Sequence, residues 1–460
     1  MGSQSTNMDR IRTSLIVLGV AVCWWGCSQT PTPVVESVRA ASERTPVVFV
    51  PGVTGVGLRD RITGKPVWGR GKNLISPHDR GYGMARPLKA DLGGPDLEPD
   101  KVILDLRLFG FVRFKVYQPL VQLFTANGYR HGDLERPRPT DDLFLFAYDW
   151  RQDNVDSALL LAKQLERLRR TRGQEHLAVN LVCQSNGAHV CRYFAKYGGL
   201  TLEDAESGKT WRPAAVEVDK VILVGTSNGG SIRVLRELDR GRKYVGTIGR
   251  FFSPESLYTI LSLYQDLPVY TEDLFVDEQG NPMAVELFDA ENWRRFEWSI
   301  YNHESRARLK RDDLPSWFGS RADRHAYLEQ ALDRSQRFHR LLQQEVVDFD
   351  AIEYHQIMNT SNVTSSRAVL RQHNGRWQTL FADDKEVEQR PELRAAMTVA
   401  GDGHATRASQ EWLSRQERER IVQEPIQVEG SHRRMILEPA TQQSILEILA
   451  SGIDSERSGP

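Results

Sequence analysis

The stretch Leu177-Ala-Val-Asn-Leu-Val-Cys-Gln-Ser-Asn-Gly187 decides the fold. Its first seven residues are almost wholly apolar, which is typical of a strand buried on both faces of a parallel sheet. The residues that follow match a variant of the nucleophile elbow Gly-x-Ser-x-Gly, in which small residues two before and two after the Ser let backbones pass closely. Gly187 satisfies this pattern fully and Cys183 only in part. Ser185 is therefore predicted to project from a tight strand-to-helix turn.

Similar apolar runs lie on both sides of this stretch and alternate with helical patterns. Such alternation predicts right-handed βαβ units and one parallel sheet with helices on both faces, the α/β-hydrolase fold class. In such sheets the chemistry lies at the carboxyl ends of the strands. The expected strands are 46–50, 143–147, 177–183, 218–225, 354–358, 396–400 and 425–428, and the expected helices are 116–127, 156–172, 187–197 and 439–450.

The alternation stops over residues 240–344, which are helical in pattern and rich in aromatic residues. We interpret this segment as a cap inserted between strands. Length alone allows either about three domains of about 150 residues or one capped domain. The strand order favours one domain over residues 46–450, followed by a disordered tail at 451–460. The aromatic residues indicate either a binding surface for a long acyl chain or the cap's own core: Phe251, Phe252, Tyr258, Tyr264, Tyr270, Trp293, Phe296 and Trp298.

A second motif matches the elbow pattern literally, Gly225-Thr-Ser-Asn-Gly229 at the end of the fourth expected strand. In this fold class the elbow follows the third strand, counted from the strand that precedes the oxyanion loop. Residues 46–50, 143–147 and 177–183 are these three strands, so the strand order favours Ser185 over Ser227. Gly229 and Gly230 would also make a poor first helical turn, at about 1 kcal/mol for each interior Gly.

A Ser becomes a nucleophile when a base takes its proton and a carboxylate fixes the tautomer of that base. In this fold class the acid and the His follow the Ser in the chain, on loops after late strands. Asp402 and His432 lie on such loops, although each alone would be an ordinary loop residue. His404 is the main alternative base, and His189 is expected to pack within its helix.

The oxyanion of an acyl-transfer intermediate needs two backbone donors. The N–H of Asn186, directly after the predicted nucleophile, is one candidate. The N–H of Val53, in the Gly-rich loop after the first expected strand, is the other.

The N-terminus predicts an export signal over residues 1–27. Arg10 and Arg12 precede an apolar run that is too short to span a bilayer at about 20 residues. The run ends in Gly26-Cys27-Ser28, the pattern that a lipoprotein signal peptidase needs before Cys27 receives lipid. An ordinary secretory peptide is the alternative. Residues 28–45 form the expected linker. The location would be periplasmic or on the cell envelope if Cys27 is lipidated, and otherwise secreted.

Composition excludes several classes of function. The 60 Lys and Arg residues nearly balance the 61 Asp and Glu residues among 460, so no charge footprint for nucleic acid is present. At 40% hydrophobic residues the chain is not a polytopic membrane protein. Outside the export signal only Cys183 and Cys191 remain, which do not make a disulfide framework, and no zinc-ligand spacing is present.

Together these residues resemble the lecithin:cholesterol acyltransferase and lysosomal phospholipase A family of α/β-hydrolases. The resemblance spans residues 47–449. Cys183 stands where the family has Gly, Gln184 where it has His, and His404 near where it has Thr. The family's cysteine-bridged lid has no Cys pair here. The motifs that carry the resemblance are Pro51-Gly52-x-x-Gly55-x-x-Leu58, Tyr117-x-Pro119-Leu120, Gly128-Tyr129, Tyr148-Asp149-Trp150-Arg151, the elbow at Ser185, Gly225-Thr226-x-Asn228-x-Gly230-Ser231, Leu267-Pro268, Gly401-Asp402-Gly403, Ala405-Thr406-Arg407 and His432.

The resemblance implies a serine acyltransferase or lipase that acts on phospholipid-type esters at a membrane surface or lipid aggregate. Its triad would be Ser185, Asp402 and His432, without cofactor or metal. The alternatives are a carboxylesterase or phospholipase without a specific alcohol acceptor, and a non-catalytic exported lipid-binding protein.

Overall fold

The computed structural model describes residues 44–70, 79–108, 112–211, 215–243, 251–270, 272–310, 314–347, 349 and 352–451. The predicted export signal, nearly all of the linker and residues 452–460 of the predicted tail lie outside these residues. The described part belongs to one compact unit, 33–460.

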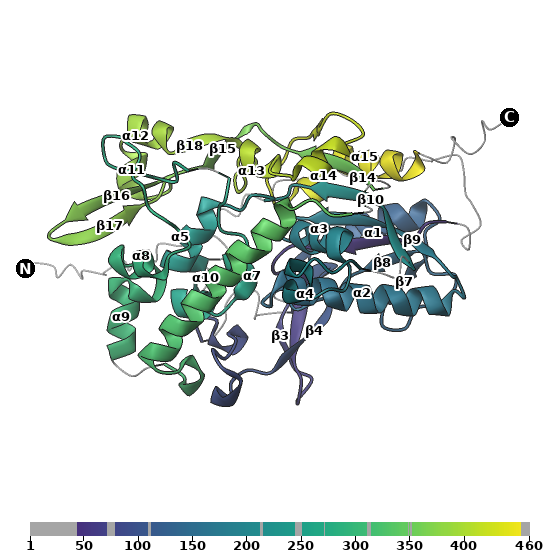
Figure 1. Ribbon diagram of the computed structural model, residues 1–460, viewed down its shortest axis with the longest axis horizontal. Coiled ribbons are helices and arrows are strands. Elements are labelled where there is room, and N and C mark those ends of the chain that lie inside the picture. Colours follow the sequence, from purple (N-terminus) through teal and green to yellow (C-terminus); the bar gives the residue numbers. More distant parts are fainter. Residues whose placement is uncertain are drawn as a thin grey trace, which may run out of the picture. The chain divides into compact units, whose positions relative to one another are not determined.

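The centre of this unit is a seven-stranded sheet whose neighbouring strands all pair in parallel (Figure 1). Val48 of β1 lies opposite Phe144 on one side and Leu181 on the other. All four residues of β1 are fully buried. A strand buried on both faces needs cover on both, as the apolar sequence predicted. In spatial order the strands are β19 (Ile426–Gln427), β14 (Glu353–Met358), β10 (Val216–Val224), β9 (Leu177–Gln184), β1 (Val47–Val50), β8 (Leu143–Leu145) and β7 (His131–Gly132).

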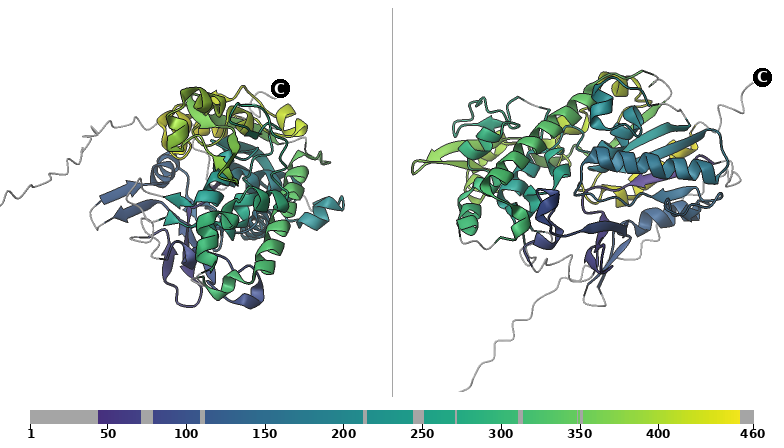
Figure 2. Two further views of the ribbon diagram at one scale, coloured as in Figure 1. Left: turned by 90° about the vertical axis from the view of Figure 1, so that its left-hand side faces the viewer. Right: turned by 60° about the horizontal axis from the view of Figure 1, so that its bottom comes forward.

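Helices from distant parts of the chain cover the sheet. Helices α2 and α3 pack against each other, and α3 contacts β1, β9 and β10, while α1 and α15 form a second packed pair (Figures 1 and 2). The predicted α/β-hydrolase fold is therefore confirmed. The core helices are α1 (Gln118–Ala126), α2 (Asn154–Thr171), α3 (Gly187–Tyr197), α4 (Leu202–Glu206), α13 (Arg407–Gln410), α14 (Arg415–Glu419) and α15 (Pro439–Ala450).

One expected strand of the sheet is wrong. Residues 396–400 overlap β18 (Thr398–Gly401), but β18 pairs antiparallel with β15 (Asn362–Ser365) in a separate two-stranded sheet. Its residues Val399 and Ala400 are exposed, whereas a strand of the central sheet would be buried. Alternating apolar residues predicted a strand correctly and its partner incorrectly, because pairing depends on contacts distant in sequence.

Small antiparallel sheets lie between β1 and α1, where the sequence showed only a Gly- and Pro-rich stretch. One consists of β3, β2 and β4, and the other of β5 and β6. Their bounds are β2 (Val56–Asp60), β3 (Pro66–Trp68), β4 (Leu97–Val102), β5 (Asp105–Leu108) and β6 (Val112–Lys115).

Between β10 and β14 the described residues add no strand to the central sheet and are mainly helical. A later segment joins this region: β16 pairs with β13, and Trp298 donates a 2.7 Å hydrogen bond to the Thr379 hydroxyl on β17. The domain limits remain predictions. The elements concerned are α5 (Ile232–Arg240), β11 (Arg242–Lys243), β12 (Phe251–Phe252), α6 (Pro254–Tyr258), α7 (Leu261–Tyr264), β13 (Phe275–Val276), α8 (Ala290–Arg295), α9 (His303–Lys310), α10 (Arg321–Gln343), β16 (Ala368–His373), β17 (Arg376–Leu380), α11 (Lys385–Glu388) and α12 (Pro391–Ala396).

Candidate active site

Ser185 lies on a strained turn between β9 and α3. Its φ is 53°, in the left-handed region that a non-Gly residue rarely adopts. A Cβ on Gly187 would lie 2.3 Å from the Val50 carbonyl oxygen, and a Cβ on Gly52 would lie 2.7 Å from Ser185 Cβ. Both glycines are therefore needed for the close approach of backbones around Ser185, as the elbow pattern predicted.

A disulfide spans this turn. Cys183 at the end of β9 is bonded to Cys191 on α3, eight residues later. From the sequence, Cys183 was interpreted as a replacement for glycine, and Cys183 and Cys191 were not expected to make a disulfide framework, so this bond was not predicted. The tight turn between β9 and α3 brings the two cysteines close in space, and this proximity depends on the folded elbow.

The structure brings Ser185, His432 and Asp402 together from three loops. The Ser185 hydroxyl lies 2.8 Å from His432 Nε2, and His432 Nδ1 lies 2.7 Å from Asp402 Oδ2. His432 is 9% exposed and Asp402 is fully buried. The imidazole therefore bridges hydroxyl and carboxylate, the arrangement that proton transfer from a serine requires.

Backbone amides fix the carboxylate of Asp402. Its other oxygen, Oδ1, accepts hydrogen bonds of 2.8 Å from the amides of His404 and Ala405. Burial alone would raise the pKa of Asp402, but the facing His432 ring outweighs it and holds the pKa below its usual range. The carboxylate thus stays charged and keeps the proton of His432 on Nδ1.

The two predicted oxyanion donors lie on segments that border the serine. The loop after β1 reaches Ser185, because a Cβ on Gly52 would be 3.1 Å from its Oγ. Among the hydrogen bonds found within the described residues, none is donated by the amide of Val53 or Asn186. The two amides therefore remain candidate donors.

The competing residues of the sequence gather instead around the carboxylate of Asp266. Ser227 is fully buried, and its hydroxyl donates a 2.6 Å hydrogen bond to Asp266. His189 and His404 lie 3.5 Å and 3.6 Å from the same carboxylate. Ser227 is also absent from the described residues with positive φ, so it does not occupy an elbow.

Ser185 and His432 line a cavity of about 570 Å³. Its lining contains apolar side chains, several basic side chains and the carboxylates of Glu237, Asp266 and Asp402. The apolar residues come mostly from the segment between β1 and α1: Trp68, Ile103, Leu106, Val116, with Leu263 from α7. The cationic residues are Lys115, Arg233, Arg242, Arg433 and Arg434.

The aromatic residues of the cap are not part of this wall. Trp293 packs against Tyr264 and Trp298 with ring centroids 5.8 Å apart in both pairs, and all three are fully buried. Of the two interpretations of the cap aromatics, the structure favours a core of their own over an acyl-chain surface.

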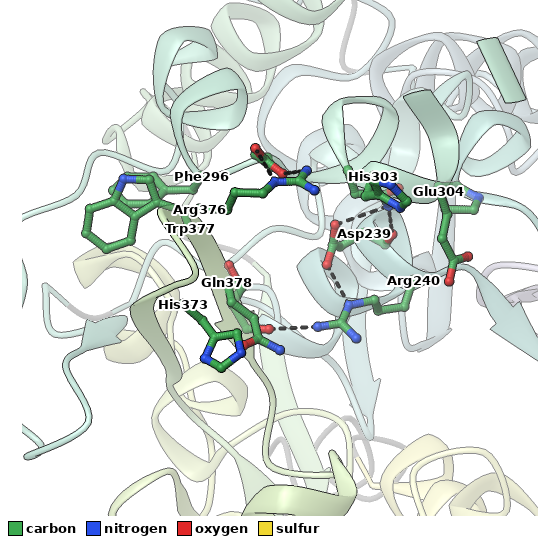
Figure 3. A pocket seen from close by; sticks show the side chains of 13 residues that line it. Asp239, Arg240, Phe296, His303, Glu304, His373, Arg376, Trp377 and Gln378 are labelled. Atoms are coloured by element: carbon green, nitrogen blue, oxygen red, sulfur yellow. Dashed lines mark hydrogen bonds and ion pairs between the residues drawn. The ribbon is translucent and has the colours of Figure 1, made fainter. Parts of the chain in front are cut away.

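A second cavity, of about 590 Å³, lies between the end of α5, α9 and the β16–β17 hairpin (Figure 3). Charged residues line it in pairs, since Arg240 lies 2.8 Å from Asp239, and Arg376 contacts Glu297. None of the predicted site residues lines this cavity.

Sequence reasoning missed one further contact beside the serine. Tyr117 donates a 2.7 Å hydrogen bond to the side-chain oxygen of Gln184, and both residues line the cavity of Ser185. The Tyr117 motif and the replacement of His by Gln at 184 were visible separately in the sequence, but their contact depends on the folded loop.

The described residues contain neither a candidate metal site nor a candidate membrane-spanning helix. No group of three or more His, Cys, Asp or Glu side chains in them could hold a metal ion. No helix in the same residues is long and apolar enough to cross a membrane.

Comparison with known proteins points to one family. Residues 107–304 match the family model of lecithin:cholesterol acyltransferase, a segment that includes Ser185 and ends before Asp402 and His432. No curated protein matches the chain. Among solved structures, 21 chains match.

One of these solved chains comes from the crystal structure of a Tle4-Tli4 complex, with 13% identity and a TM-score of 0.54. The match covers 88% of this chain and 98% of that chain. At this identity the likeness shows the fold alone. The resemblance drawn from the sequence is thus confirmed: residues 107–304 match the lecithin:cholesterol acyltransferase family model, and the chain has an α/β-hydrolase fold.

Proposed function

We propose that this protein is a serine acyltransferase or lipase that transfers the acyl group of a phospholipid-type ester through an acyl-enzyme. The family match supports the broader class, an esterase or acyltransferase of lipid esters. The observation that carries the proposal is the continuous path from the Ser185 hydroxyl through His432 to Asp402, with contacts of 2.8 Å and 2.7 Å.

In the first half-reaction, Ser185 Oγ forms a bond to the ester carbonyl carbon while His432 Nε2 takes the hydroxyl proton. The negative charge on the carbonyl oxygen is stabilised by the amides of Val53 and Asn186. When the tetrahedral intermediate collapses, the bond to the leaving alcohol breaks and His432 returns the proton to that alcohol. The acyl group then remains on Ser185.

In the second half-reaction, water or an alcohol gives its proton to His432 and attacks the acyl carbonyl. Ser185 leaves and recovers its proton from His432. Which acceptor wins depends on how well the cavity holds a hydroxyl in line, since good positioning supplies effective molarities of about 10⁵ M or more.

The apolar and basic side chains that line the cavity support a lipid ester with an anionic head group. An acyl chain suits the surface formed by Trp68, Ile103 and Leu106, because burying apolar area gains about 25 cal/mol per Å². A phosphate suits the basic residues of the lining, among which Arg433 follows His432 directly.

Labelling with a fluorophosphonate tests the nucleophile. We expect one adduct on the wild-type protein, at Ser185, and none on Ser185→Ala. No adduct on the wild type would favour the non-catalytic lipid-binding alternative. An adduct that persists in Ser185→Ala, with Ser227→Ala as the matched control, would exclude Ser185 as the nucleophile.

Product analysis tests the acceptor. The purified protein is incubated with a phospholipid, with and without a sterol or another alcohol, and the products are identified by mass spectrometry. A new ester of the added alcohol supports an acyltransferase. Free fatty acid alone supports a lipase or phospholipase, and a preference for short p-nitrophenyl esters would indicate a small-ester esterase.

We also propose that the protein is exported and acts at a membrane surface or lipid aggregate, on the basis of the apolar segment that ends at Cys27. Mass spectrometry of the mature N-terminus tests this. A lipid-modified Cys27 supports a cell-envelope lipoprotein, an unmodified new N-terminus nearby supports secretion, and an intact N-terminus contradicts export.

A further inference from the structure

Three side chains that resemble parts of a hydrolytic site in the sequence all lie against one carboxylate, that of Asp266. The Ser227 hydroxyl donates to Oδ1 at 2.6 Å, His189 Nε2 is 3.5 Å from the same oxygen, and His404 Nε2 is 3.6 Å from Oδ2. Asp266 follows α7, is 4% exposed and also lines the cavity of Ser185.

This cluster is not a second hydrolytic site. Ser227 gives its hydrogen bond to the carboxylate and not to a histidine, so no base is in place to take its proton. Burial alone would raise the pKa of Asp266, but the facing rings of His189 and His404 outweigh it and hold the pKa far below the usual range. Such a carboxylate is a poor base and a permanent negative charge.

The cluster does touch the base of the proposed reaction. The imidazole rings of His404 and His432 lie with their centroids 4.4 Å apart and their planes tilted by 36°. The backbone amide of His404 donates to Asp402 at 2.8 Å. His404 therefore contacts both residues on which Ser185 depends, and Asp266 holds the far end of its ring.

We propose that His404, oriented by Asp266, is a positioning residue for His432 in the proposed acyl-transfer reaction, and this inference rests on that reaction. The His404 ring covers one face of His432 and limits its rotation away from Ser185. The Asp266 carboxylate favours the tautomer of His404 with its proton on Nε2. A neutral ring there leaves His432 free to become positively charged as it takes the serine proton.

The surroundings of His404 agree with a neutral ring. Burial lowers the pKa of His404, and the neighbouring His432 lowers it further, while Asp266 opposes both. Its side chain is 16% exposed. The charged and titratable groups that face it come from the loop of His432, from its own loop, from the segment after α7 and from α5: His432, Asp402, Asp266, Glu237 and Arg233.

Variants of His404 give the first test. His404→Ala removes the ring, and we expect kcat on a soluble p-nitrophenyl ester to fall about 10- to 100-fold with little change in KM, because the base loses its orientation. His404→Phe keeps a flat ring without charge and should recover most of this loss. Ser227→Ala is the matched control, since it removes another partner of Asp266 without touching His432, and its kcat should stay close to that of the wild type.

The pH profile separates a positioning role from a merely structural one. Removal of the ring exposes one side of the Ser185, His432 and Asp402 group to water, so the acid limb of the kcat/KM profile in His404→Ala should move by about half a unit or more. In His404→Phe it should stay within about 0.2 unit of the wild type. If His404 were only structural, His404→Ala would lower the fraction of active protein, which titration with fluorophosphonate measures. The acid limb of the kcat/KM profile would then stay where it is in the wild type.

A double-mutant cycle tests the role of Asp266. Asp266→Asn should lower kcat when His404 is present and change it less than about twofold in the His404→Phe background, because Asp266 acts through His404. Additive losses would overturn the inference, as would a His404→Ala variant with wild-type kcat and an unmoved acid limb. Failure of the wild type to react with fluorophosphonate would instead contradict the proposed function itself.

Discussion

Cys183, near the end of β9, and Cys191, on α3, form a disulfide that closes the turn carrying Ser185. The bond spans the turn on which Ser185 adopts a positive φ. One of its two cysteines, Cys183, stands where an elbow usually has glycine. In this chain the residue at that position is Cys183, which is larger than glycine and is bonded covalently to the helix that follows the elbow.

Removal of this disulfide should lower stability. We expect Cys183→Ala/Cys191→Ala to lose about 2–4 kcal/mol, because the link restricts the unfolded chain. The measurement is the thermal midpoint with and without dithiothreitol. The reductant should lower the midpoint of the wild type and leave the double variant unchanged. Equal midpoints for all four samples would contradict a stabilising disulfide.

Asp402→Asn should lower kcat by about 10³- to 10⁴-fold with KM little changed, since the tautomer of His432 would no longer be fixed. The losses in Ser185→Ala and His432→Ala should not add, because the two residues act as one unit. Steady-state kinetics on a p-nitrophenyl ester measures all three. Multiplying losses in the Ser185/His432 double variant would contradict a shared relay.

Gly52→Ala should reduce activity at least about 100-fold, because its Cβ would lie 2.7 Å from Ser185 Cβ and displace the loop that carries Val53. Gly57→Ala is the control, since the nearest atom to its Cβ would be 3.3 Å away and far from the serine side chain. Circular dichroism should show the same fold for both. Full activity in Gly52→Ala would mean that the loop does not need its observed position.

A buried ion pair ties α3 to α14. Arg192 donates two hydrogen bonds of 2.7 Å to Glu417, and neither side chain is exposed. Glu417→Gln should cost about 3–5 kcal/mol, because it leaves a buried guanidinium unpaired, whereas Arg192→Met/Glu417→Leu should cost less. Thermal midpoints compare the variants. A double variant less stable than the single one would contradict this explanation.

Stability should fall as the pH drops below about 4, near the ordinary carboxyl pKa. The pKa values of Asp266, Glu237, Glu417 and Asp402 are all lowered in the folded protein, because opposing charges and hydrogen bonds outweigh burial. The unfolded chain then binds more protons than the folded one, so acid favours unfolding. The slope of the thermal midpoint between pH 6 and pH 3 measures this, and it should be shallower in Arg192→Met/Glu417→Leu. A midpoint that rises in acid would contradict the sign.

Local sequence patterns predicted the residues that gather at the carboxyl ends of the strands. Ser185 and His432 follow β9 and β19, and parallel strands bring such loops to one edge, whereas Asp402 follows β18 of the separate antiparallel pair. The pairing of residues 396–400 could not be predicted in the same way, because the sequence of a short strand does not specify which other strand it pairs with. Asp266 was missed for a related reason, since its three partners come from α3, the loop after β10 and the Asp402 loop.

The composition of the cap was less informative than its connectivity. Aromatic residues there suggested a surface for an acyl chain, yet rings such as Trp293 and Trp298 are buried against each other. The apolar wall beside Ser185 comes instead from the Gly- and Pro-rich stretch after β1, where Trp68 and Ile103 were not singled out. Burial depends on which segments meet, and residue type alone does not specify that.

The pairing of β13 with β16 has a consequence for the order in which the chain folds. The cap region is completed by a hairpin that follows β14, so a strand of the central sheet lies between its two parts in the sequence. During synthesis, the sheet of β13, β16 and β17 can form only after the chain has been made as far as residue 380. Contacts this distant in sequence slow folding and expose apolar surface meanwhile. A truncated protein that ends after α10 would therefore lack β14 and β19 of the central sheet and also β16 and β17, which form a sheet with β13 of the cap.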